Sequence, residues 1–131
     1  MIYKHIRQDG FVDASKLRQR VHQLDARRRG LLDRVLRPGP MVVGSLYQMR
    51  RRCGKPGCKC VRGQLHASWY LSRAEGGRTK LTYIGKIVPD HLGRRVRRYQ
   101  EHQKVLAEIR KIDAEISGHL NRLRDQALEG P

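Results

Sequence analysis

The sequence contains 131 residues, of which 29 are Lys or Arg and 12 are Asp or Glu, so its formal net charge is +17. Only 5% of the residues are aromatic, no apolar run approaches the roughly 20 residues of a membrane span, and the first residues lack the apolar core of a secretory signal. These features exclude a membrane-spanning protein and a secreted disulfide framework, and they predict a cytoplasmic, nucleoid-associated protein with a polyanionic partner.

A first helix is predicted over residues 14–37, after an N-terminal segment of residues 1–13. Either Asp13 or Ser15 can cap its start, and the following Pro-Gly-Pro sequence stops it. Its apolar positions have the spacing of a heptad seam, and they are Leu17, Val21, Leu24, Leu31 and Val35.

A small β head is predicted over residues 41–88. Strand-like runs cover residues 41–50, 66–73 and 78–84. The first run is the least regular because Gly44 interrupts it. We therefore expect a three-stranded antiparallel sheet whose first strand is the least defined.

The last two strands are predicted to form a hairpin, because Gly76-Gly77 is typical of a two-residue turn. The opposed pairs that this turn predicts are Tyr70 with Tyr83, Arg73 with Lys80, and Glu75 with Arg78.

A second, longer helix is predicted over residues 89–128. Its distal apolar residues also have coiled-coil spacing, and they are Val105, Ile109, Ile112, Ile116, Leu120, Leu123 and Ala127. The predicted fold is therefore α+β, with the sheet between two helices that form an antiparallel coiled-coil stalk. The longer helix is expected to leave apolar residues around 116–123 without an intrachain partner, which predicts self-association into a dimer or binding of a helical partner protein.

A cluster of sulfur and imidazole ligands lies in the β head. Cys53, Cys58, Cys60 and His66 have the spacing C-x4-C-x-C-x5-H, and such a Cys₃His set suits a structural Zn²⁺ ion. A small head with few aromatics gains stability from such a metal. Three alternatives remain open: thiols without a ligand role, a redox pair (Cys53–Cys58 or Cys58–Cys60), or a fourth ligand other than His66.

Basic charge is concentrated in this head. Residues 41–88 carry ten Lys or Arg and a single acid, Glu75. Such an excess is the electrostatic footprint of phosphate-backbone binding. The candidate nucleic-acid-binding residues are Arg50, Arg51, Arg52, Lys55, Lys59, Arg62, Arg73, Arg78, Lys80, Arg94, Arg95, Arg97 and Arg98. Trp69 and Tyr70 are able to stack on bases, although a single Trp in a small head is more typical of a core.

The middle of the chain resembles a small family of prokaryotic domains of unknown function. The residues that carry the resemblance are Gly44-Ser45-Leu46-Tyr47, Cys53-Gly54-Lys55-Pro56-Gly57-Cys58-Lys59-Cys60, Arg62-Gly63, His66, Trp69-Tyr70-Leu71-Ser72, Gly77 and Tyr83. Members share a C-G-K-P-x-C-x-C core and an H-x-x-x-Y-L-S strand, and the family is often met near mobile-element genes. Ala67-Ser68 departs from the Gly-Pro that follows the His in the family.

The sequence thus predicts a zinc-stabilised nucleic-acid-binding protein, with duplex DNA favoured over RNA, that acts as an accessory or regulatory factor, such as one of a mobile element. An RNA-binding ribonucleoprotein component and a coiled-coil adaptor that recruits a nucleic-acid enzyme are the alternatives. An enzyme is not expected, because a metal-dependent nuclease needs clustered carboxylates and a Cys₃His zinc site is closed to water.

Overall fold

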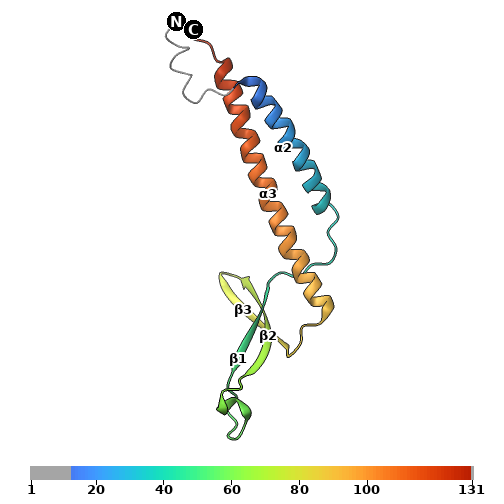
Figure 1. Cartoon of the computed structure of the whole chain (residues 1–131), viewed down its shortest axis with the longest axis vertical. Helices are drawn as coiled ribbons and strands as arrows, with labels where there is room; N and C mark the ends of the chain where they lie inside the picture. Colours follow the sequence, from blue (N-terminus) through green and yellow to red (C-terminus); the bar gives the residue numbers. More distant parts are fainter. Residues whose placement is uncertain (1–12, 131) are drawn as a thin grey trace. The chain divides into compact units, whose positions relative to one another are not determined.

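The structure is a computed structural model, and it describes residues 13–130 apart from the side chains of Cys60 and Val61. Its elements are α2 (Ala14–Val35), β1 (Ser45–Arg51), the 3₁₀ helix η1 (Lys59–Arg62), β2 (His66–Glu75), β3 (Arg78–Gly85) and α3 (Asp90–Ala127), as Figure 1 shows. The predicted α+β class, with a three-stranded antiparallel sheet between two helices in the sequence, is confirmed. The predicted segment 1–13 lies outside the described residues except for Asp13.

The chain divides into two compact units, and α3 contributes to both. The first, here called the helical unit, combines residues 13–37 with residues 105–130 of the described chain. The second, here called the basic unit, consists of residues 38–104 and therefore contains the whole sheet and the first turns of α3.

In the helical unit, Asp13 is the residue that caps α2. Its Oδ1 accepts a hydrogen bond from the backbone N–H of Ser15 at 2.8 Å, which satisfies one of the helix's unpaired donors. The helix ends at Val35, two residues before the predicted boundary, and the Leu36 N–H closes it by donating to Leu32 O at 3.0 Å. The helix therefore ends before the Pro-Gly-Pro sequence begins.

Helix α2 pairs antiparallel with the C-terminal half of α3 (Figure 1). The buried side chains of this unit are Leu17, Leu24, Val105, Ile109 and Ile112, all from the predicted apolar seams. The ion pairs that bridge the two helices are Arg20 with Glu115 (3.6 Å), Arg27 with Glu108 (2.7 Å) and Arg28 with Asp113 (2.6 Å). Three arginines of α2 are thus paired with acids of α3.

The distal part of α3 keeps some apolar surface. Ile116 and Leu123 are half-buried, whereas Leu120 is 51% exposed. Self-association through this region remains a prediction. Neither α2 nor α3 contains a stretch long and apolar enough to span a membrane.

In the basic unit, the strand order is β1-β2-β3 and both pairings are antiparallel. Gly76 (φ 59°) and Gly77 (φ 76°) form the turn between β2 and β3, and two residues with positive φ are what a type I′ turn requires. The three predicted cross-strand pairs, Tyr70–Tyr83, Arg73–Lys80 and Glu75–Arg78, are all confirmed.

The first strand was predicted over residues 41–50, and its start is wrong. β1 begins at Ser45, because the preceding segment follows α3 instead of the sheet: the Val42 N–H donates to Arg95 O at 3.1 Å. Gly44 makes the change of direction with φ +135°, in a region that glycine enters without strain.

A Gly44→Ala substitution is expected to destabilise the protein by about 1–3 kcal/mol. A Cβ at this position would lie 2.7 Å from Ser72 O and 2.8 Å from Leu71 Cδ1, in addition to the unfavourable φ. The measurement is the free energy of unfolding by urea. Gly54→Ala is the matched control, since nothing lies within 4 Å of its Cβ position and its φ is not in the glycine region; equal stabilities of the two variants would contradict this explanation.

Candidate metal centre and nucleic-acid interface

The connection between β1 and β2 is unusually long for a hairpin. It comprises residues 52–65, whereas hairpin loops usually have about 2–5 residues. Its folding is local: the Cys58 N–H donates to Lys55 O just before η1, and the Gln64 N–H donates to Lys59 O across η1, both at 3.3 Å. Gly57 (φ 87°) and Gly63 (φ 98°) provide the two tight reversals that return the chain to β2.

This folding brings three of the four predicted metal ligands together. Cys53 follows the end of β1, Cys58 precedes η1, and His66 is the first residue of β2. The Sγ atoms of the two cysteines and a ring nitrogen of His66 all lie within 4.8 Å of one another, and Cys58 Sγ lies 2.9 Å from His66 Nε2. In a tetrahedral zinc site with ordinary bond lengths, ligand atoms are separated by about 3.5–3.8 Å. Cys58 Sγ and His66 Nε2, at 2.9 Å, would therefore have to move slightly apart to hold an ion.

The fourth predicted ligand, Cys60, belongs to η1, and its side chain lies outside the described residues. Cys53 and Cys58 are thiols and half-buried, whereas His66 is exposed. Two thiols and an imidazole are the ligands of soft and borderline metals, and together they could hold a metal ion.

The position of the cluster gives a bound metal a direct structural effect. Arg51 and His66 form the last pair of the β1–β2 ladder. A metal held by Cys53 and His66 would therefore tie the two strands together immediately beyond their last pairing. It would also close the long loop, whose ordering otherwise opposes folding.

The predicted nucleic-acid-binding residues all lie in the basic unit. They are Arg50 and Arg51 in β1, Arg52 just after it, Lys55, Lys59 and Arg62 in the connection, Arg73, Arg78 and Lys80 in the β2–β3 hairpin, and Arg94, Arg95, Arg97 and Arg98 in the first turns of α3. All are exposed except Arg73, which is half-buried.

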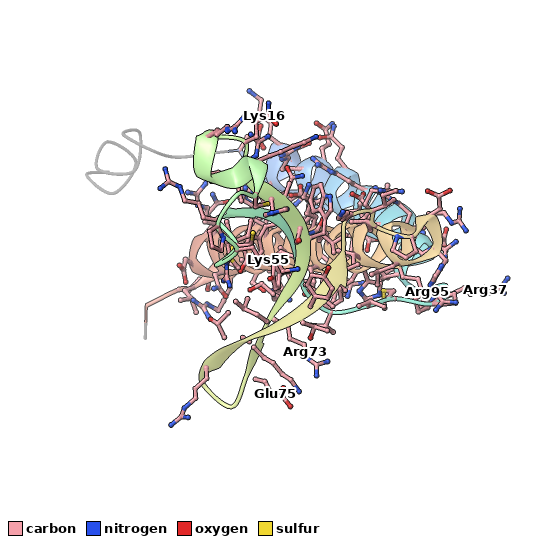
Figure 2. The ribbon with its side chains drawn as sticks, turned by 90° about the horizontal axis from the view of Figure 1, so that it is seen from below. Lys16, Arg37, Lys55, Arg73, Glu75 and Arg95 are labelled. Atoms are coloured by element: carbon pink, nitrogen blue, oxygen red, sulfur yellow. The ribbon has the colours of Figure 1, made fainter. Side chains whose placement is uncertain are left out.

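Acidic residues neutralise little of this charge. The basic unit contains 15 Lys or Arg but only three acids, namely Glu75, Asp90 and Glu101. Within the described residues, Glu75 pairs with Arg73 (3.5 Å) and with Lys80 (3.6 Å). Figure 2 shows Arg73 and Glu75 close together on the hairpin.

Two of the candidate arginines also have local structural contacts. Arg98 Nη1 lies 3.5 Å from Pro40 O, and its guanidinium covers Gly39. Arg51 Nε and Nη2 lie 3.3 and 3.1 Å from Met49 Sδ, and its guanidinium carbon is 5.7 Å from the centre of the Tyr70 ring. Arg98 therefore supports the chain before β1, and Arg51 is fixed over the sheet.

A row of tyrosines on the sheet was missed by the sequence prediction. Tyr47, Tyr70 and Tyr83 are directly paired across β1, β2 and β3. The hairpin turn predicts that Tyr70 and Tyr83 are neighbours, but the position of Tyr47 depends on the β1–β2 register, which no short turn specifies. Trp69 is half-buried.

The comparisons with known proteins identify the family. No curated protein and no solved structure matches the chain. A family model described as a domain of unknown function, DUF6788, matches residues 21–94, which is more than half of the chain. This range includes the sheet, the Cys/His cluster and the last turns of α2. The chain therefore belongs to the DUF6788 family.

Proposed function

We propose that the basic unit is stabilised by zinc and binds nucleic acid through the phosphate backbone, with duplex DNA as its principal ligand. The observation that carries this proposal is the excess of 15 Lys or Arg over three acids in residues 38–104. Exposed guanidinium and ammonium groups of this density release condensed counterions when they contact phosphates, and this release supplies most of the affinity in sequence-independent binding.

The β2–β3 hairpin has the dimensions of a groove-binding element. A two-stranded antiparallel ribbon fits the major groove of DNA. Its two-residue turn makes the tip narrow, and Arg78 is the first residue after the turn. Arginine donates in a planar fork that matches both phosphates and the acceptor edge of guanine. We assign Arg78 and Lys80 to contacts within the groove, and Arg50 and Arg52 to the phosphates beside it.

Zinc is the metal that the ligands favour. Two thiolates and an imidazole prefer Zn²⁺ to the oxygen-seeking ions Mg²⁺ and Ca²⁺. Cys60 is proposed as the fourth ligand, which would complete a closed tetrahedral site. The role of this site is structural, since it leaves no position for a substrate or a catalytic water.

The helical unit is proposed to form an antiparallel coiled-coil stalk that also mediates self-association. Support comes from its buried heptad positions and from Leu120, which is 51% exposed on the same helix as the buried Ile109 and Ile112. This would give the accessory or regulatory factor two nucleic-acid-binding units per dimer.

The affinity for duplex DNA is expected to fall steeply with salt. The measurement is the fluorescence anisotropy of a labelled 20-base-pair duplex at salt concentrations between about 50 and 300 mM. Six to ten phosphate contacts predict a loss in affinity of about 10³–10⁵-fold between 50 and 200 mM. A flat plot of log K against log salt would contradict backbone binding, and tighter binding of structured RNA in competition would assign the unit to RNA instead.

A further inference from the structure

One face of the sheet carries a continuous row of aromatic rings. The Tyr47 and Tyr70 rings are stacked, with centres 6.1 Å apart and planes inclined by 27°. Tyr83 extends the row, with its ring centre 5.5 Å from that of Tyr70 and its plane turned by 71°. Each strand thus contributes one tyrosine, and the strand pairing holds the three rings in register.

The outer end of this row is open to solvent. Tyr83 is 62% exposed, and Leu81, two residues away on the same face of β3, is 44% exposed. By contrast, Leu71, which points to the opposite face of β2, is buried. Tyr47 and Tyr70 are half-buried, so Tyr83 is the ring of the row to which a flat aromatic ligand has the most access.

The charge around the row favours one kind of ligand. The Arg51 guanidinium lies 5.7 Å from the Tyr70 ring centre, and Arg51 is on the same face of β1 as Tyr47. Flat rings beside a cation suit an anionic ligand that also has π-faces, and this is what an unpaired nucleotide offers. Within a duplex the bases are stacked on one another, so apart from the terminal pairs only their edges are accessible.

We propose that the Tyr47–Tyr70–Tyr83 row is a stacking platform for unpaired bases of DNA, so that the protein prefers duplexes that carry a single-stranded extension. This inference rests on the proposed function, and it specifies the nucleic acid that the same basic unit selects. Sheet-borne aromatics in a known nucleic-acid-binding module stack two or three bases, which suits a row of three rings.

The test compares three labelled DNA ligands with the full chain: a blunt 16-base-pair duplex, the same duplex with a four-nucleotide extension, and a longer blunt duplex with as many phosphates as the extended one. The third ligand matches the charge of the extended one. The extended ligand is expected to bind about 5- to 150-fold more tightly, the range measured for the stacking of one base. A Tyr83→Ala variant is expected to lose this preference but to keep the affinity for the blunt duplex.

Two variants separate stacking from other effects. Tyr83→Phe retains the ring and is expected to retain the preference. Leu81→Ala removes an exposed apolar side chain from the same face of β3 and is expected to leave the preference unchanged. The fluorescence spectrum of Trp69 shows whether each variant keeps the sheet, because this half-buried side chain lies in β2 next to Tyr70.

The outcomes distinguish this inference from the function on which it rests. If the blunt duplex binds with a steep salt dependence but the extension adds nothing, or if Tyr83→Ala keeps the preference, the stacking platform is wrong and backbone binding stands. If neither ligand binds, the proposed function fails and the inference fails with it.

Discussion

A Cys58→Ser variant is expected to lose the proposed metal ion and the ordered pairing of β1 with β2. Cys58 Sγ lies 2.9 Å from His66 Nε2, so the substitution removes one of the three side chains that could hold the ion. For structural zinc sites the free energy of metal binding, about 10–16 kcal/mol in small peptides, is also free energy of folding. We expect the metal content to fall from one ion per chain to none, as measured by elemental analysis.

The effect on the sheet is expected to be local to the basic unit. Hydrogen exchange should show loss of protection in β1 and β2, whereas α2 and the distal half of α3 have their own buried core and should remain protected. A His66→Ala variant is expected to behave like Cys58→Ser, and His22→Ala, an exposed histidine of α2, is the matched control. If the Cys58→Ser variant keeps both its metal content and the hydrogen-exchange protection of β1 and β2, this thiol is not a ligand.

Removal of three exposed arginines is expected to weaken DNA binding by about 100-fold at 0.15 M salt. The variant combines Arg50→Gln, Arg52→Gln and Arg78→Gln, and it leaves Arg51, which contacts Met49 and Tyr70, in place. If each arginine neutralises one phosphate, the slope of log K against log salt should decrease by about 2.7 in magnitude. The measurement is the same anisotropy titration over a series of salt concentrations.

The control must remove the same charge from elsewhere in the chain. Arg110, Lys111 and Arg122 are exposed residues of α3 that belong to the helical unit. Their replacement by Gln lowers the net charge equally but should change the slope far less, because these residues are not assigned to phosphate contacts. Equal effects of the two triple variants would mean that binding follows net charge and not the basic surface described here.

The elements that the sequence predicts correctly are those that depend on residues close together in the chain. Gly76-Gly77 alone specifies the hairpin register. A two-residue turn between twisted strands requires positive φ at both of its residues, and both glycines have it. The helices follow from apolar spacing, and a proline precedes the start of α3. The start of β1 was wrong because it depends on a tertiary contact, the hydrogen bond between Val42 N–H and Arg95 O.

The sequence predicts the Cys/His cluster of the candidate site, but it does not predict the tyrosine row on the sheet. The spacing of Cys53, Cys58 and His66 in a Gly- and Pro-rich segment predicts that they converge, and the structure brings these three together. The tyrosine row was not predictable, because its third member depends on pairing across the connection of residues 52–65. Composition also cannot show which arginines are neutralised; only the antiparallel arrangement shows that Arg27 and Arg28 pair with acids of α3.

The proposed metal ion is expected to hold the basic sheet together. Elemental analysis of the purified 131-residue chain, before and after treatment with a strong chelator, is the decisive measurement. We predict about one zinc ion per chain, with loss of the Trp69 fluorescence signal of the folded sheet and of DNA binding when the chelator removes it. A chain that contains no metal and yet keeps protected amides in β1 and β2 would contradict the claim.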